Sequence, residues 1–229
     1  MDCDAIKIAK MIDHSILKPE ATLADLENGC ATAMKHKTAT VCVRPCDVSS
    51  AKGFLQGSDT AVAVVVGFPH GANSTCVKAY ETECAIRDGA TEIDMVMNYG
   101  RLISGEYDYV EDEIRAVTNI AHKHKAIVKV IFETCALNES LIIEACKICN
   151  VASVDFVKTS TGFGAHGARP EDVILMKKYC NPAIRIKASG GIKTFDAVIE
   201  MMRLGVTRIG TSSTEAIMQE AKDKYENRT

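Results

Sequence analysis

Short apolar runs alternate with longer amphipathic stretches along the whole chain. The short runs are rich in β-branched residues, which favour strands. They lie at Met11–Leu17, Ala39–Val43, Ala61–Gly67, Glu92–Met97, Ala126–Phe132, Ser153–Lys158, Ala183–Ala188 and Thr207–Gly210. Most of them are nearly continuous in hydrophobicity, which indicates burial on both faces, as in a parallel sheet. The pattern therefore predicts eight strands.

The longer stretches between these runs have the spacing of amphipathic helices. They lie at Leu23–Lys35, Thr75–Asp88, Asp108–His122, Asn138–Cys149, Pro170–Tyr179, Thr194–Leu204 and Ser213–Lys224. Asn138 and Thr194 are residue types that cap helix N-termini, and Pro170 is followed by two acidic residues that suit a first turn. A further short helix is expected at Asp4–Met11.

Eight strand–helix units in 229 residues predict an α/β fold made of a single (β/α)8 TIM barrel with a short N-terminal helix. No Pro/Ser-rich linker or change of composition divides the chain, so residues 1–229 are expected to form one domain. The alternative that the pattern leaves open is a doubly wound, open sheet.

Composition narrows the class of protein. Hydrophobic residues make up 47% of the chain and charged residues 25%, which is typical of globular proteins. The net charge of −3 argues against nucleic acid as a partner. The longest apolar run, Ala61–Val66, is far too short to span a membrane, and the acidic N-terminus lacks the apolar core of a signal peptide. We expect a cytoplasmic protein with no membrane partner.

The chain contains ten cysteines, two of which, Cys146 and Cys149, form a C-x-x-C pair. No second such pair or histidine cluster completes a zinc site. The pair falls in a predicted helix, and nothing directs the chain to an oxidising compartment. We therefore expect reduced, structural thiols, and neither a metal nor a cofactor.

Four charged residues interrupt the predicted strands near their C-terminal ends: Asp94, Lys129, Lys158 and Lys187. Active sites of such barrels form at that end of the strands, and side chains of neighbouring strands can meet in one cavity. Each lysine by itself could extend its amine into water. That interpretation fails for all of them together, because helices cover the outside of the barrel.

A lysine cluster has a chemical use. A second ammonium group lowers the pKa of the first, so that a neutral amine becomes available to attack an aldehyde or ketone. The resulting protonated Schiff base withdraws electrons from the neighbouring carbon, which is the chemistry of a metal-independent class I aldolase. Asp94 could exchange a proton with a substrate hydroxyl.

Glycine-bearing loops point to a phosphate group. Gly190 and Gly191 follow the seventh predicted strand, and Gly210, Ser212 and Ser213 end the eighth and open a helix. In phosphate-binding barrels the anion lies on the loops after these two strands, near free backbone N–H groups. A third loop, with Thr161 and Gly162, follows Lys158 and could close on the substrate. The expected partners are a small sugar phosphate and aldehydes.

These motifs give the chain a resemblance to the deoxyribose-phosphate aldolase family over essentially its whole length. The matching stretches are Ile12–Pro19, Val41–Pro45, Val66–Gly71, Glu92–Asn98, Phe156–Gly162, Lys187–Ile192 and Arg208–Ser213. The resemblance implies reversible cleavage of 2-deoxy-D-ribose 5-phosphate to D-glyceraldehyde 3-phosphate and acetaldehyde. It also implies that Lys158 forms the Schiff base, that Lys187 tunes it, and that Asp94 relays protons.

Asp13 and Lys129 match positions that line the pocket in this family, and Cys42 at the end of the second predicted strand is expected near it. Two features depart from the pattern. Some members end in a tyrosine, whereas here four residues follow Tyr225, and some carry a lysine where this chain has Phe163. The alternatives are another phosphate-binding barrel isomerase or lyase, or a catalytically silent sugar-phosphate sensor. A homo-oligomer is compatible with the sequence.

Overall fold

The computed structural model describes residues 3–226, and its strands form one closed, parallel barrel. The strands pair in chain order from β1 to β8, and β8 closes on β1. They are β1 (Ile12–Ile16), β2 (Thr40–Val43), β3 (Ala61–Val66), β4 (Glu92–Val96), β5 (Ile127–Ile131), β6 (Phe156–Lys158), β7 (Arg185–Ser189) and β8 (Arg208–Thr211). The predicted closed barrel is confirmed, and the open, doubly wound sheet is excluded.

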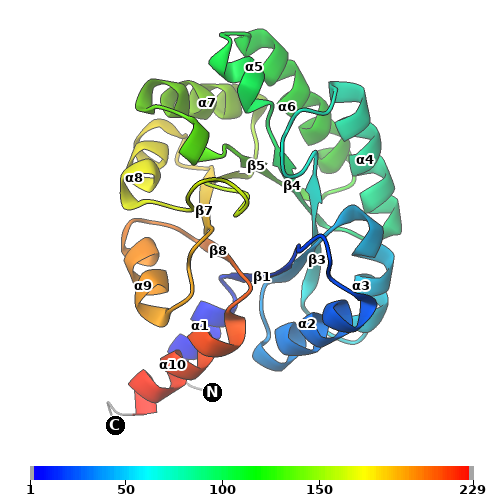
Figure 1. Cartoon of the computed structure of the whole chain (residues 1–229), viewed down its shortest axis with the longest axis vertical. Coiled ribbons are helices and arrows are strands. Elements are labelled where there is room, and N and C mark those ends of the chain that lie inside the picture. The colour runs from blue at the N-terminus through cyan, green and yellow to red at the C-terminus, as the bar shows by residue number, and fades with distance from the viewer. Residues whose placement is uncertain (1–2, 227–229) are drawn as a thin grey trace.

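The helices form a ring around the strands (Figure 1). They are α1 (Cys3–Ala9), α2 (Leu23–His36), α3 (Val48–Phe54), α4 (Thr75–Asp88), α5 (Tyr99–Ile103), α6 (Tyr107–Lys123), α7 (Glu139–Ala152), α8 (Pro170–Tyr179), α9 (Phe195–Arg203) and α10 (Thr214–Glu226), with short 3-10 turns η1 (Pro45–Asp47) and η2 (Thr134–Ala136). The sequence analysis did not predict α3 and α5, which have seven and five residues and give only a weak 3.6-residue period.

One predicted strand starts too early. The expected strand Ser153–Lys158 is shortened to Phe156–Lys158, because α7 continues to Ala152. Ser153 then ends that helix in the left-handed conformation, with φ of 55°. A left-handed residue cannot continue either a helix or a strand, so the chain needs two further residues before pairing begins.

Successive side chains of each strand point alternately outward, beneath the helices, and inward, into the barrel. Outward-facing residues such as Val64, Ile93 and Val130 belong to the main hydrophobic core beneath the helices. Inside the barrel, Cys42, Ala63 and Val65 form a small apolar cluster of their own. The rest of the inward positions on β4 to β8 carry many charged side chains, so the apolar layer that stabilises the fold lies outside the barrel and leaves its interior for polar chemistry.

Strand register sets which charged residues become neighbours. Asp94 of β4 pairs with Lys129 of β5, and Lys158 of β6 pairs with Lys187 of β7. Lys187 in turn pairs with Arg208 of β8. Because neighbouring strands lie about 4.8 Å apart, these side chains point into one shared space.

The first and last helices lie side by side, where α1 packs against α10 (Figure 1). The side chain of Tyr225, and residues 227–229 that follow α10, lie outside the described residues. Within residues 3–226, no helix is long and apolar enough to cross a membrane. Cys146 and Cys149 are buried free thiols, and a hydrogen bond with Cys180 raises the pKa of Cys146.

Candidate active site

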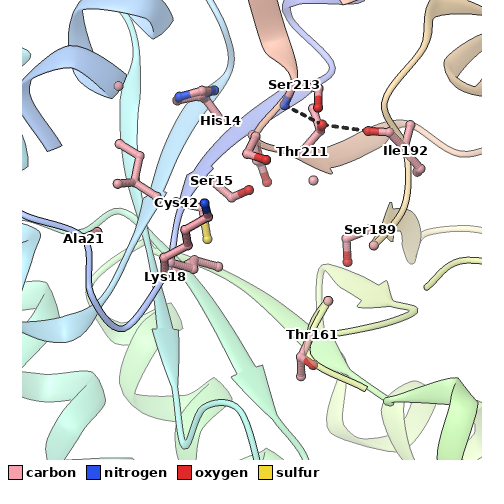
Figure 2. Close-up of a pocket in the computed structure, with 18 of the residues that line it drawn as sticks. His14, Ser15, Lys18, Ala21, Cys42, Thr161, Ser189, Ile192, Thr211 and Ser213 are labelled. Carbon is pink, nitrogen blue, oxygen red and sulfur yellow. Dashed lines mark hydrogen bonds between the residues drawn. The ribbon is translucent and has the colours of Figure 1, made fainter. Parts of the chain in front are cut away.

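A cavity of about 800 Å³ opens at the C-terminal end of the strands (Figure 2). Most of the predicted site residues line it: Asp13, Cys42, Lys158, Thr161, Gly162, Lys187, Gly190, Gly191, Gly210, Ser212 and Ser213. Asp94 and Lys129 are fully buried and do not line its wall. They lie behind the wall, where Asp94 contacts Lys158 and Lys187, and Lys129 contacts Asp94.

Two amines converge on one carboxylate oxygen at the base of the cavity. Lys158 is the last residue of β6 and is 2% exposed. Its Nζ donates to Asp94 Oδ2 at 2.7 Å, and Lys187 Nζ donates to the same oxygen at 2.6 Å. Lys187 also donates to Asp13 Oδ2. Cys42 Sγ lies 3.9 Å from Asp94 Oδ2.

The two amines differ in their preference for a proton. Burial lowers the pKa of Lys158; the Asp94 carboxylate opposes that shift, and the Lys187 ammonium adds to it. Burial also opposes the charge on Lys187, but the Asp13 and Asp94 carboxylates outweigh it and raise its pKa. The arrangement therefore favours a neutral Lys158 beside a charged Lys187.

The Asp94 carboxylate stays ionised. Burial opposes its negative charge, but the surrounding ammonium groups outweigh that effect and hold its pKa well below the usual range. Burial and the Asp94 charge together raise the pKa of Cys42 to about 11. Cys42 is thus a neutral thiol next to the amines rather than a thiolate competitor for an aldehyde.

A second layer of charges lies beneath this pair. Lys129 Nζ lies 2.6 Å from both Glu92 Oε2 and Asp94 Oδ1. Arg208 donates to Asp13 Oδ1 at 2.6 Å and to Glu92 Oε2 at 2.9 Å. The sequence prediction included neither Glu92 nor Arg208. Glu92 could have been found from its place two residues before Asp94, since alternate residues of a strand share a face.

The predicted phosphate loops meet at the mouth of the cavity. Gly190 has φ of 85°, and a Cβ there would lie 2.7 Å from Gly167 Cα, so this turn requires glycine. Thr211 Oγ1 donates to Ile192 O at 2.7 Å and accepts from Ser213 N at 2.9 Å, which ties the loop after β8 to the loop after β7 (Figure 2). Ser213 precedes α10, whose first N–H groups lack helical acceptors.

Glu133 fixes the third loop, and the sequence analysis did not identify it. This buried residue lies in the loop after β5, directly before η2, with φ of 54°. Its carboxylate accepts from the backbone N–H of Thr161 at 3.2 Å and from the Thr161 hydroxyl. A left-handed, non-glycine residue carries a conformational cost. Here it aims a carboxylate at the loop that follows Lys158.

Phe163 lines the cavity, and its ring packs edge-on against Phe68 with 5.4 Å between centroids. No cation is therefore supplied by this position. Lys18 and Lys193 line the same cavity and provide positive charge at its rim. His14 also lines it, with Nδ1 2.8 Å from the Thr214 hydroxyl.

Comparison with known proteins identifies the family of the chain. The sequence pattern of the DeoC/LacD family aldolases matches residues 7–220. A deoxyribose-phosphate aldolase of Clostridium perfringens is 48% identical over 216 residues, which cover 94% of this chain and 96% of that protein. One from Caldicellulosiruptor saccharolyticus is 51% identical over 215 residues, which cover 93% of this chain and 98% of that protein.

Solved structures show the same fold. The aldolase QR15 has a TM-score of 0.92 and 38% identity, covering 98% of this chain and all of its own. The tetrameric deoxyribose phosphate aldolase of Aeropyrum pernix has a TM-score of 0.89 and 28% identity, covering 96% of this chain and 93% of its own. The family resemblance expected from the sequence motifs is thereby confirmed.

Proposed function

The chain belongs to the DeoC/LacD family of aldolases, and we propose that it reversibly cleaves 2-deoxy-D-ribose 5-phosphate to D-glyceraldehyde 3-phosphate and acetaldehyde. The observation that carries the proposal is the pair of buried amines, Lys158 and Lys187, that share one oxygen of Asp94 at the base of a cavity. One amine of the pair is disposed to lose its proton and the other to keep it.

The reaction begins at Lys158. Its neutral Nζ adds to the C1 aldehyde carbon of the open-chain sugar, and the carbinolamine loses water to give an iminium ion. The charged Lys187 beside it donates a proton to the departing hydroxyl. Placing both groups on adjacent strands fixes their separation before the substrate arrives.

Carbon–carbon cleavage follows from the iminium ion. The Asp94 carboxylate, with Lys187 beside it, accepts the proton of the C3 hydroxyl directly or through water. The C3–O electrons form the new carbonyl, the C2–C3 bond breaks, and its electron pair passes to C2 and the iminium nitrogen. The products of this step are D-glyceraldehyde 3-phosphate and an enamine on Lys158. Protonation of the enamine at C2 and hydrolysis release acetaldehyde and the free amine.

The phosphate end of the substrate gives orientation. Gly190, Gly191, Ser212 and Ser213, with Thr161 and Gly162 from the third loop, line the cavity mouth. Backbone N–H groups of glycine turns and the N-terminus of α10 favour a dianion there. Binding at this end holds C1 at Lys158.

Reductive trapping tests the proposal. The protein is incubated with 2-deoxyribose 5-phosphate and borohydride, and peptides are then identified by mass spectrometry. We expect the adduct on Lys158. An active enzyme without an adduct would point to a phosphate-binding isomerase, and sugar-phosphate binding with neither adduct nor turnover would point to a sensor.

The Lys158→Arg variant supplies the control. Arginine has a long side chain like that of lysine, but it stays charged and cannot form a Schiff base. We expect this variant to lose both turnover and adduct while retaining most of its affinity for the phosphate. Comparable turnover in Lys158→Arg would refute the assignment of the nucleophile.

A further inference from the structure

The interior of the barrel holds more positive than negative side chains. Among the residues that the structure describes, three buried carboxylates and four buried cations meet there: Asp13, Glu92, Asp94, Lys129, Lys158, Lys187 and Arg208. With every group ionised, one positive charge would be in excess. An excess charge is costly in an interior that water does not screen, so the cluster favours the loss of one proton.

Arg208 cannot supply that proton, because a guanidinium stays charged in proteins. It is held by two carboxylates, with its Nη1 2.6 Å from Asp13 Oδ1 and 2.9 Å from Glu92 Oε2. The proton must therefore leave one of the lysines.

Of the three lysines, Lys158 has the fewest carboxylate contacts to stabilise its protonated form. Lys129 and Lys187 each contact two or more carboxylates. Within the described part of the chain, Lys158 contacts Asp94 alone and shares that oxygen with Lys187. The pKa directions agree: burial lowers the pKa of Lys158, whereas carboxylates overcome burial and raise the pKa of the other two lysines.

We propose that Arg208 is a positioning residue whose permanent charge, buried beside Asp13 and Glu92, keeps the Lys158 amine without its proton. This inference rests on the proposed function, in which Lys158 must be neutral to attack a carbonyl. It places one determinant of reactivity on β8, at the opposite end of the strand from the phosphate loop.

The groups that face Lys158 come from several strands. They are Cys42 of β2, Asp94 of β4 and Lys187 of β7. The charged groups in contact with these are Lys129 of β5, Asp13 of β1, Glu92 of β4 and Arg208 of β8. Glu133, in the loop after β5, accepts a hydrogen bond from Thr161 instead. Removal of Arg208 leaves the contact between Lys158 and Asp94 intact.

Arg185 provides a matched control. The guanidinium groups of Arg185 and Arg208 both lie over the Phe156 ring, 4.0 Å and 5.4 Å from its centroid. Arg185 is exposed, whereas Arg208 is buried against carboxylates. Replacing either with methionine removes a guanidinium from the same ring, but only the Arg208 change alters the charge of the interior.

The test follows the reductive trapping of acetaldehyde on Lys158 across a pH series, for the parent, Arg208→Met, Arg208→Lys and Arg185→Met. In Arg208→Met, three carboxylates balance three lysines, so Lys158 keeps its proton to higher pH. We expect the acid limb of trapping to move up by about one pH unit. Arg208→Lys and Arg185→Met should keep the pH midpoint of the parent. A purely structural role of Arg208 would not produce this pattern.

A variant of opposite sign covers the case in which Arg208→Met does not fold. Glu92→Gln removes one negative charge, so the acid limb should move down. The inference is overturned if folded Arg208→Met or Glu92→Gln keeps the parent midpoint, or if Arg185→Met moves as far as Arg208→Met. Absence of any adduct on Lys158 in the parent overturns the proposed function itself, whereas an adduct with equal midpoints in all variants overturns this inference alone.

Discussion

Lys78 and Lys158 are both buried beside a carboxylate, yet their surroundings differ in kind. Lys78 of α4 is completely buried, and its Nζ donates to Gly71 O at 2.7 Å, Val96 O at 2.8 Å and Glu113 Oε1 at 2.6 Å. All three donor positions are satisfied, and Lys78 lines no part of the large cavity. Lys158 lines that cavity, and its carboxylate oxygen is shared with a second amine.

Burial lowers the pKa of both lysines, so the direction of the shift does not distinguish them. The contacts do. Lys78 joins the turn after β3 to the end of β4, and Glu113 accepts from the backbone N–H of Asn98 at 2.8 Å. A buried lysine with a full set of acceptors stabilises a loop, whereas a buried lysine with a shared acceptor and an open side can react.

The largest expected effect is on turnover, which should depend on Lys158 and not on Lys78. Lys158→Met should lower kcat by at least about 10⁴-fold, as expected when a covalent nucleophile is removed. Asp94 keeps its contacts with Lys129 and Lys187, so the free energy of unfolding should stay close to that of the parent. Steady-state kinetics and urea unfolding measure the two quantities. Residual turnover within tenfold of the parent would show that Lys158 is not the nucleophile and would remove the distinction between it and Lys78.

Lys78→Met should show the opposite result. It leaves the Glu113 carboxylate buried without its cation, which costs about 3–5 kcal/mol of unfolding free energy. The fraction that remains folded should turn over at a rate of the parent's order. Urea unfolding and active-site titration by reductive trapping check this. A stable but inactive Lys78→Met would show that Lys78 belongs to the reaction.

Removing both charges of that pair sharpens the comparison further. The double variant Lys78→Met/Glu113→Leu should regain about 2 kcal/mol over Lys78→Met, because no bare charge remains in the core. The hydrogen bonds to the Gly71 and Val96 carbonyls stay lost, so recovery should be incomplete. If urea unfolding gives equal stabilities for the single and double variants, the unpaired charge of Glu113 is not the cause of the stability lost in Lys78→Met.

The smallest effect concerns His14, a buried base that resists protonation. Burial and the nearby His36 lower its pKa from 6.5 to about 4. As pH falls from 7 to 5, His14 becomes protonated in the unfolded chain but stays neutral in the folded protein. The free energy of unfolding therefore falls by about 2 kcal/mol because of this residue. His14→Gln should therefore lose less stability over this range. Equal pH dependence in urea unfolding would contradict the assignment.

The sequence predicted the residues whose chemistry is visible locally. Lys158 and Lys187 stand out because a lysine near the end of a buried strand is rare unless its charge is paired or it takes part in a reaction. Arg208 and Glu92 were missed because they stand at the first residue of β8 and of β4, where charges are common. Their meaning comes from contacts across 195 and 116 residues of chain, which only the closed barrel creates. Glu133 was missed for the same reason, since its partner Thr161 lies on another loop.

The pairing of Arg208 with Asp13 joins the last strand of the barrel to the first. During synthesis the β1 residue leaves the ribosome early and the β8 residue near the end. Until both are present, the ionic array around the central amine is incomplete. An unfinished or truncated chain therefore lacks the buried charge that, in our proposal, keeps the Lys158 amine neutral, so the proposed reactivity requires that β8 has closed on β1.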